Sequence, residues 1–133
     1  MPPPDFFRLL RESLEGIRMD EPEVHRALTR SLGRLRARLV SDGAACVVWL
    51  EFDAWRMDPG DCDADIEVAF DRQIILDLID GRLTLEDAIL GEQLLIFGSV
   101  DKVEAFSDAL LIYIEGLIRM PGTPALLRGY RQQ

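Results

Sequence analysis

Apolar side chains recur at intervals of three and four residues along the first forty positions, a spacing typical of amphipathic helices. The first predicted helix places its apolar side chains at Phe6, Leu10, Leu14 and Ile17. A second helix is expected to begin near Asp20, which stands in a capping-box arrangement with Glu23, because Pro22 is tolerated in a first turn. Its apolar stripe predicts a helix to about residue 40 and consists of Val24, Leu28, Leu32, Leu35 and Leu39.

From residue 44 the period changes to two, which predicts strands. The first predicted strand, Ala44–Phe52, directs Cys46, Val48 and Leu50 to one face. A second strand is expected over about 53–58. A third, 64–70, alternates strictly between apolar and acidic positions, as expected of a half-buried antiparallel strand with one face in water.

Capping signals then predict two short helices. Asp71 suits the N-cap of a helix over 72–79, and Gly81 supplies the left-handed residue that commonly ends a helix. Thr84 is the expected N-cap of a second short helix that ends at Gly91.

An apolar strand and a long helix complete the predicted elements. Leu94–Phe97 is apolar on both faces, which predicts an interior strand. The long helix begins at Asp101, and its apolar stripe is wider than one packing face requires. The stripe consists of Val103, Phe106, Leu110, Tyr113, Ile114 and Leu117, with Ala105, Ala109 and Ile112 beside it.

This order of elements predicts an α+β fold, with a small, mainly antiparallel sheet of four to five strands and helices packed on one face. At 133 residues the chain is long enough for one hydrophobic core. We divide it into an N-terminal extension with an amphipathic helix (1–20), a domain (21–120) and a C-terminal tail (121–133).

The composition is 48% hydrophobic and 29% charged, as in globular proteins, and no stretch reaches the roughly 18–20 apolar residues of a membrane span. The net charge is −9 and uneven, with ten acidic residues against two arginines between Glu51 and Asp80. Residues 1–40 instead hold eight arginines against six acidic residues. The acidity argues against nucleic acid as a partner and against more than transient membrane contact.

The chain offers few residues for catalysis. His25 is the only histidine, and we expect it to be exposed on the polar side of the second helix. Cys46 and Cys62 lack the spacing of a metal or redox motif. The sequence therefore predicts no enzyme, no catalytic residue and no cofactor.

Two charged runs have both a structural and a functional interpretation. Arginines follow one side of the second predicted helix at four-residue spacing. They are interpreted either as a solvated face or as a docking strip for an acidic partner or lipid headgroups. They are Arg26, Arg30, Arg34 and Arg38. The acidic run 58–67 fails as an EF-hand because Ile66 replaces the required glycine and Arg72 the required glutamate. We expect solvated acids and no dedicated metal site there, with surface cation binding as the weaker alternative.

The segment from Ala64 to Gly98 resembles the sterol carrier protein-2 (SCP2) family of lipid-binding domains. In that family an alternating strand, here 64–70, leads to a short helix and a G-(K/R)-L turn, here Gly81-Arg82-Leu83. A glycine-containing run then enters the last strand, here A-I-L-G-E-Q-L-L-I-F-G over 88–98.

The resemblance implies a cavity between sheet and helices that holds an acyl chain, a sterol or a similar apolar molecule, with no side chain performing chemistry. The apolar surplus of the chain fits such a cavity, and it also fits a filled core or a dimer face. By matching segment and inward face, the cavity lining would be drawn from Val48, Leu50, Ile66, Val68, Ile75, Leu78, Ile79, Ile89, Leu94, Ile96, Phe106 and Leu110.

The chain also departs from the family. Residues 51–55 lack the glycine-rich turn that commonly joins the first two strands, and the C-terminus lacks the peroxisomal S-K-L address of the eukaryotic carriers. With no secretory signal pattern either, we expect a cytoplasmic, bacterial protein. The leading hypothesis is non-catalytic binding or transfer of a hydrophobic small molecule. The alternative is a structural or regulatory interaction module, a homodimer that keeps the fold without a ligand.

Overall fold

The structure, a computed structural model, describes residues 6–59 and 62–131. Within these residues one open sheet is formed by β1 (Ala37–Ser41), β2 (Ala44–Glu51), β3 (Ala54–Pro59), β4 (Ile66–Phe70) and β5 (Leu95–Phe97). The helices are α1 (Phe6–Asp20), α2 (Pro22–Leu32), α3 (Arg72–Ile79), α4 (Leu85–Leu90), α5 (Val100–Arg119) and α6 (Thr123–Arg131).

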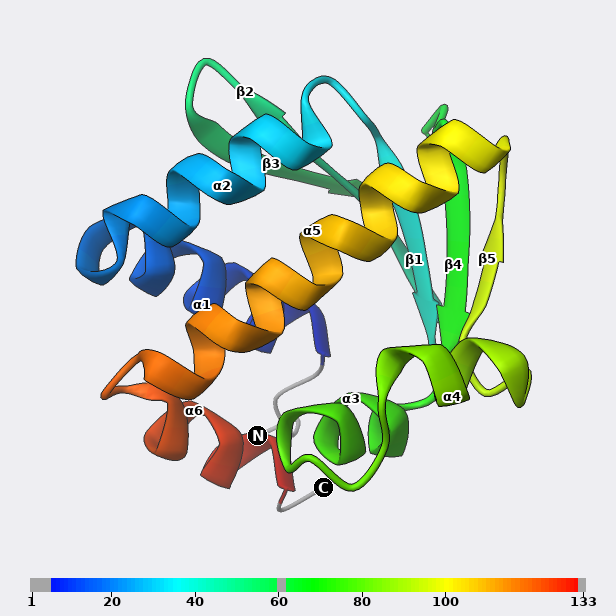
Figure 1. Cartoon of the computed structure of the whole chain (residues 1–133). Coiled ribbons are helices and arrows are strands. Elements are labelled where there is room, and N and C mark those ends of the chain that lie inside the picture. The colour runs from blue at the N-terminus through cyan, green and yellow to red at the C-terminus, as the bar shows by residue number, and fades with distance from the viewer. Residues whose placement is uncertain (1–5, 60–61, 132–133) are drawn as a thin grey trace.

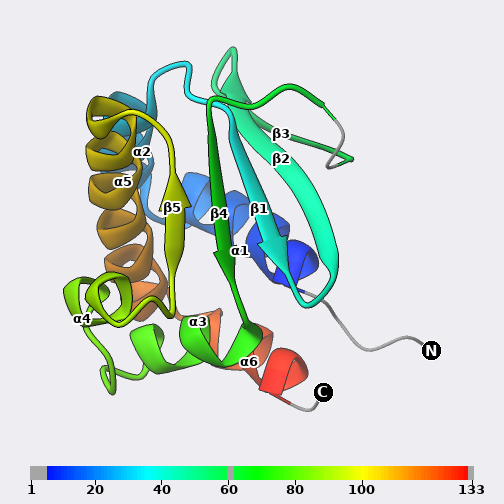
Figure 2. The ribbon, with the colours of Figure 1, turned by 90° about the vertical axis from the view of Figure 1, so that its right-hand side faces the viewer.

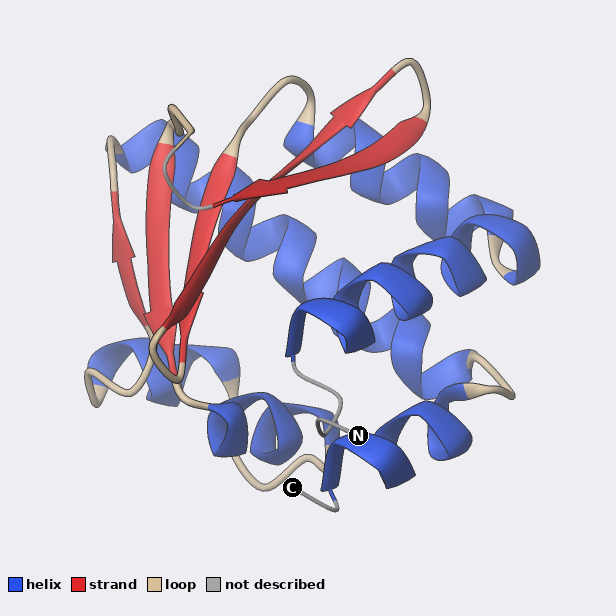
Figure 3. Cartoon of the chain, turned by 180° about the vertical axis from the view of Figure 1, so that it is seen from behind, coloured by secondary structure: helices blue, strands red, loops and turns tan. Residues whose placement is uncertain are grey.

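The strands lie in the order β3-β2-β1-β4-β5. β1 pairs with β4 in parallel, and the other three pairings are antiparallel. α5 runs beside α2 along one side of the sheet, while α3, α4 and α6 lie at its lower end (Figures 1 and 2). Figure 3 shows the strands from behind, on the side away from α5. The predicted α+β fold, with a mainly antiparallel sheet and helices packed on one face, is confirmed.

Two tight turns connect the first three strands. Asp42 and Gly43 both have positive φ, and so do Phe52 and Asp53. Each pair stands between directly paired strand residues, as in a two-residue hairpin whose turn follows the twist of the strands. The predicted strands over 44–52 and 53–58 are confirmed as β2 and β3, with their bounds moved by one residue at the turn.

The predicted long second helix is wrong after Leu32. Gly33 follows α2 with φ 56° and ψ −121°, a conformation that glycine adopts far more readily than other residues, and the chain continues as β1. The capping box is also absent, because Asp20 is the last residue of α1 and the residue before α2, Glu21, makes no side-chain cap hydrogen bond. The predicted arginine strip is therefore divided, since Arg38 belongs to β1.

The inward faces of the strands match the predicted alternation in part, since Cys46, Val47 and Val48 of β2 are all buried. Val48 of β2 stands opposite Ala37 of β1, which in turn neighbours Ile66 of β4, and all three side chains are buried. β5 differs from the prediction of an interior strand, because it lies at the edge of the sheet. Its Leu95 and Phe97 are exposed on the outward face.

Local capping chemistry fixes the short helices as predicted. The side chain of Asp71 accepts a hydrogen bond from the backbone N–H of Ile74 at 3.2 Å, and Thr84 accepts one from Asp87 N–H at 3.1 Å. Gly81, just after α3, has a φ of 74°. These are the positions that the sequence indicated for two N-caps and one helix end.

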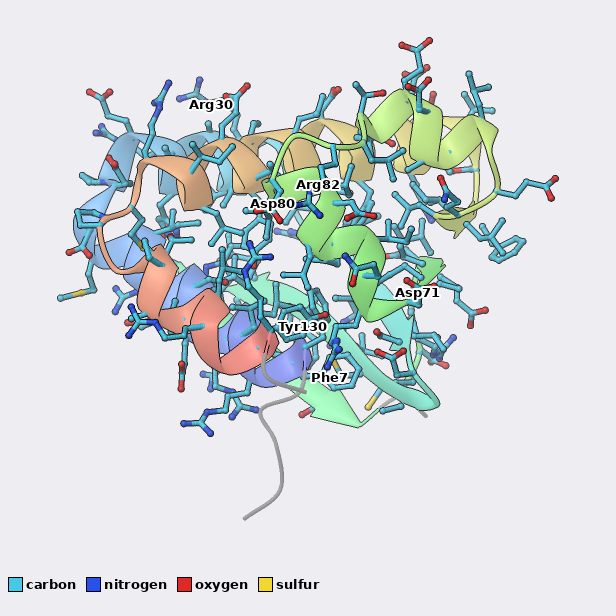
Figure 4. All side chains as sticks on the ribbon, turned by 90° about the horizontal axis from the view of Figure 1, so that it is seen from below. Phe7, Arg30, Asp71, Asp80, Arg82 and Tyr130 are labelled. Atoms are coloured by element: carbon cyan, nitrogen blue, oxygen red, sulfur yellow. The ribbon has the colours of Figure 1, made fainter. Side chains whose placement is uncertain are left out.

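Both terminal helices belong to the same core as the sheet. α1 contributes a buried apolar row that includes Phe6, and α6 contributes Leu127 and Tyr130. Tyr130 lies where α6 meets α3, as seen from below in Figure 4, and its hydroxyl donates to the Arg72 carbonyl at 3.3 Å. Arg131 makes two hydrogen bonds to the Asp80 carboxylate, at 2.6 and 3.0 Å. The residues predicted as extension and tail thus pack against the body of the domain.

Candidate functional site

An apolar cavity of about 70 Å³ lies between the sheet and the helices. Its wall is contributed by α1, α2, α3, α5 and four of the strands, together with one residue that precedes β5. The lining residues are Phe6, Leu10, Leu14, Leu28, Leu32, Leu39, Val48, Trp55, Val68, Phe70, Ile75, Leu94, Phe106, Ala109, Leu110 and Tyr113. The wall carries no ionisable group other than the Tyr113 phenol, so the cavity suits hydrocarbon.

The structure brings half of the residues predicted for the lining together at this cavity. These are Val48, Val68, Ile75, Leu94, Phe106 and Leu110. Ile66, Leu78 and Ile79 are buried in the surrounding core, and Ile89 and Ile96 are partly buried against it. Leu50 is half-buried on β2, where it stands opposite the cavity-lining Trp55.

Sequence reasoning missed the contribution of the first two helices. Phe6, Leu10 and Leu14 of α1 line the cavity, as do Leu28 and Leu32 of α2. All five belong to the apolar stripes recognised in the sequence, which predicted buried helix faces without their partners. The signal was present, but no local pattern indicates which sheet face such a helix covers.

A buried pair of hydroxyl groups stands beside the cavity. The Ser13 Oγ and Tyr113 Oη atoms are 2.6 Å apart, and Ser13 Oγ also donates to the Leu10 carbonyl at 3.0 Å. Because a serine has one hydroxyl hydrogen, the Tyr113 hydroxyl donates to Ser13. Burial raises the pKa of Tyr113, although the hydrogen bond with Ser13 opposes the shift. Both hydroxyl hydrogens are thus used within the protein, and neither is left to donate to a ligand carboxylate.

His25 is buried, in contrast to the predicted exposure. Its side chain points to the β2–β3 turn, where Nε2 lies 2.8 Å from Asp53 Oδ1, and only 5% of its surface is exposed. An ionised carboxylate can only accept, so Nε2 carries the hydrogen. Its ring meets Trp55 edge-on with centroids 6.2 Å apart, and no described residue pairs with His25 Nδ1 or Trp55 Nε1. The arrangement ties α2 to the hairpin and places no nucleophile in hydrogen-bond contact with the imidazole among the described residues.

The charged runs form no metal-binding group in the described part of the chain. Within residues 6–59 and 62–131 no group of three His, Cys, Asp or Glu side chains is placed to hold a metal ion. Asp61 of the acidic run lies outside the described residues. Arg38, from the predicted arginine strip, instead lies on the outward face of β1, where it bonds the Cys62 carbonyl and stands 3.6 Å from the Glu67 carboxylate.

No single described helix is long and apolar enough to cross a membrane. α5 and α6 together meet the length and composition of a span, but the two helices are bent by 105° at their junction.

Solved structures show which proteins the chain resembles in three dimensions. No family model matches the sequence, and no curated protein matches it. A crystal structure of sterol carrier protein 2 superposes with a TM-score of 0.60 at 14% identity, over 87% of this chain and 99% of that one. The ubiquinone synthesis protein UbiJ-SCP2 matches with a TM-score of 0.58 at 20% identity, over 77% of this chain and 87% of that one.

A third match comes from Thermus thermophilus. Its conserved hypothetical protein TT1886 has a TM-score of 0.58 at 16% identity, over 86% of this chain and 90% of that one. Because these matches cover most of both chains at low identity, they concern the path of the backbone and not individual site residues. The chain has an SCP2-like α+β fold.

Proposed function

We propose that the protein binds a hydrophobic small molecule between the sheet and the helices and carries it without chemical change. The observation that carries this proposal is the apolar cavity enclosed by α1, α2, α5 and the inner face of the sheet. Proteins named sterol carriers share the fold, which supports the same assignment. Transfer of an apolar molecule into such a wall is favourable by about 25 cal/mol for each Å² removed from water.

The size of the cavity requires that the protein opens to admit its ligand. About 70 Å³ is far below the roughly 300–1,000 Å³ of sites for drug-sized molecules. Much of the wall consists of leucine and phenylalanine side chains on helices, which can change rotamer or shift with their helix. Displacement of α1 would enlarge the cavity from one side, because this helix contributes Phe6, Leu10 and Leu14 to the wall.

The wall chemistry restricts the part of the ligand that enters. The hydroxyls of Ser13 and Tyr113 are satisfied by each other and by the backbone, and the rest of the lining is hydrocarbon or the indole of Trp55. The one donor of a lining residue that pairs with no described residue is Trp55 Nε1, and a single neutral hydrogen bond does not replace the hydration of a charged headgroup. The ligand is therefore an acyl chain, a sterol-like body or a similar hydrocarbon, with any charged end held outside.

The test is a titration with a fluorescent acyl-chain probe. Ala109 lines the cavity, so Ala109→Phe fills the space and is expected to weaken probe binding about tenfold or more, a change of about 1.4 kcal/mol. Ala125→Phe, on the exposed side of α6, is the matched control and leaves binding unchanged. Leu110→Ala enlarges the cavity and keeps or strengthens binding. Equal probe affinity for Ala109→Phe and the native chain would show that the probe does not bind in this cavity.

The close packing of the core favours one other candidate. The cavity is small because α1 fills much of the space between sheet and helices, as expected of a domain that holds no ligand. Such a domain would act as an interaction module, and the sequence predicts that it would be a homodimer. Absence of probe binding together with a stable dimer at micromolar concentration would favour this candidate.

A further inference from the structure

An apolar groove lies between α4 and the outer side of α5, away from the ligand cavity. It has a volume of about 480 Å³ and is lined by Thr84, Leu85, Glu86, Ile89, Leu90 and Leu111. Leu90 of α4 is 74% exposed and Leu111 of α5 is 47% exposed. Single exposed leucines are common on protein surfaces, but two that line one groove mark a candidate contact surface.

α5 extends this surface in both directions. Val100 and Ile118 are 73% and 62% exposed. They stand eleven residues before and seven residues after Leu111, which are three and two turns of an α-helix at 3.6 residues per turn. The three side chains therefore lie on one side of α5 as a spaced apolar stripe, about 16 Å and 10 Å apart along the helix axis, and Leu111 is the member that lines the groove beside α4.

Acidic side chains flank the stripe. Glu104, Asp108 and Glu115 are exposed on α5, and their helical positions place them in a row beside the apolar stripe, away from α4. Glu86 lines the groove from the α4 side. None of the described residues forms an ion pair with these four carboxylates.

We propose that this groove is a docking site for a basic amphipathic helix of a partner protein. The apolar side of such a helix covers Leu90, Leu111 and Ile118, and its lysines and arginines face the acidic row of α5 on one flank and Glu86 on the other. Helix-in-groove recognition uses this combination of an apolar strip and opposite charge. The acidic residues beside the apolar strip indicate that the partner is basic, which an apolar face alone would not indicate.

Two other occupants fit this surface less well than a basic partner helix. An anionic lipid surface would be repelled by the acidic row of α5 and by Glu86. A second copy of the chain offers no suitable helix, because α1 and α2 carry arginines but bury their apolar sides in their own core. The inference is independent of the proposed lipid function, since Leu111 lies outside the ligand cavity.

The test uses a fluorescein-labelled peptide of about 18 residues, five helical turns, with leucines on one side and lysines on the other. Binding to the full chain is followed by fluorescence anisotropy. Leu111→Glu is expected to weaken binding about tenfold or more, as for a residue at the centre of an interface. Met19→Glu is the matched control, because Met19 is also exposed, at 68%, but on α1. Equal affinity for Leu111→Glu and Met19→Glu overturns the proposal.

The charge contribution is tested separately with the triple variant Glu104→Gln, Asp108→Asn and Glu115→Gln. We expect weaker binding than the native chain and a smaller loss of affinity when salt is raised. A peptide with glutamates in place of the lysines should not bind. Equal binding of the acidic peptide, or binding of phosphatidylglycerol vesicles that Leu111→Glu abolishes, contradicts the proposal. A dimer of the native chain that Leu111→Glu dissociates would contradict it as well.

Discussion

At the residue scale, Gly33 decides where the second helix ends. Its φ of 56° and ψ of −121° are strained for any residue with a Cβ, although nothing lies within 4 Å of where that Cβ would stand. Any cost of substitution is therefore one of backbone conformation and not of space.

Gly33→Ala is expected to reduce the free energy of unfolding by about 1–3 kcal/mol, the usual cost of a strained backbone position. Gly122→Ala is the matched control, because a Cβ there also meets nothing within 4 Å and no positive φ opposes it. The control should be neutral or slightly stabilising, since alanine restricts the unfolded chain. Urea denaturation of both variants measures the difference, and equal stability would show that Gly33 is not needed.

The Ser13–Tyr113 pair gives a ranking of three variants. Ser13→Ala leaves the buried Tyr113 hydroxyl without its acceptor and should cost about 1–3 kcal/mol. Tyr113→Phe costs less, because Ser13 keeps its bond to the Leu10 carbonyl. The double variant should be more stable than the sum of the single costs predicts. Additive costs in denaturation experiments would contradict the pairing.

The two tyrosines of the chain predict its behaviour in alkali. Burial is the main cause that raises the pKa of both Tyr113 and Tyr130. Above the ordinary tyrosine pKa of about 10, the unfolded chain loses protons that the folded chain retains. Stability is therefore unaffected by these groups below about pH 10 and falls above it. In an absorbance titration, tyrosinate should form only as the protein unfolds; smooth titration near pH 10 in the folded state would contradict this.

At the element scale, α5 packs against α1 and α2 through a glycine. A Cβ added to Gly116 would lie 2.7 Å from Val24 Cγ1 and 3.2 Å from Ile17 Cδ1. Valine is stiff at χ1, so it has little freedom to move away.

Gly116→Ala should reduce stability by about 1–2 kcal/mol, because overpacking costs about 1–3 kcal/mol and the gain in helix propensity offsets up to about 1 kcal/mol. In the background of Val24→Ala, which removes the contacting methyls, the same substitution should be neutral or stabilising. A thermal melt of the four variants measures the coupling. A stabilising Gly116→Ala in the native background would show that the helices are not in close contact here.

Elements with local signals could be predicted from the sequence, whereas β1 could not. α3 and α4 have N-caps whose hydrogen bonds are made within three residues, so the sequence contains their ends. Around β1, Leu28, Leu32, Leu35 and Leu39 fit a helical stripe, but Leu35, Ala37 and Leu39 also alternate with arginines as in a strand. The same leucines fit both the helical period and the strand period. The conformation of Gly33 decides between the two, because it ends the helix before Leu35.

At the scale of the whole molecule, the candidate site could be predicted only in part. The strands and α5 indicated their inward residues by periodicity, and six of the predicted residues line the cavity. The contribution of Phe6, Leu10 and Leu14 depends on contacts between α1 and residues distant in the sequence, which no local pattern encodes. The edge position of β5 likewise depends on the strand order, which no local pattern encodes. β4 pairs with β1 on one side and with β5 on the other, and no further strand pairs with β5 among the described residues.

The central claim is that the space between sheet and helices takes up a hydrocarbon ligand. Native mass spectrometry of the purified protein, followed by organic extraction and identification of what is released, tests it most directly. We expect the purified chain to carry a lipid-sized adduct, identified as a fatty acyl, sterol-like or other lipid molecule, that is lost in Ala109→Phe and kept in Ala125→Phe. A bare chain that also takes up no acyl probe after delipidation would contradict the account.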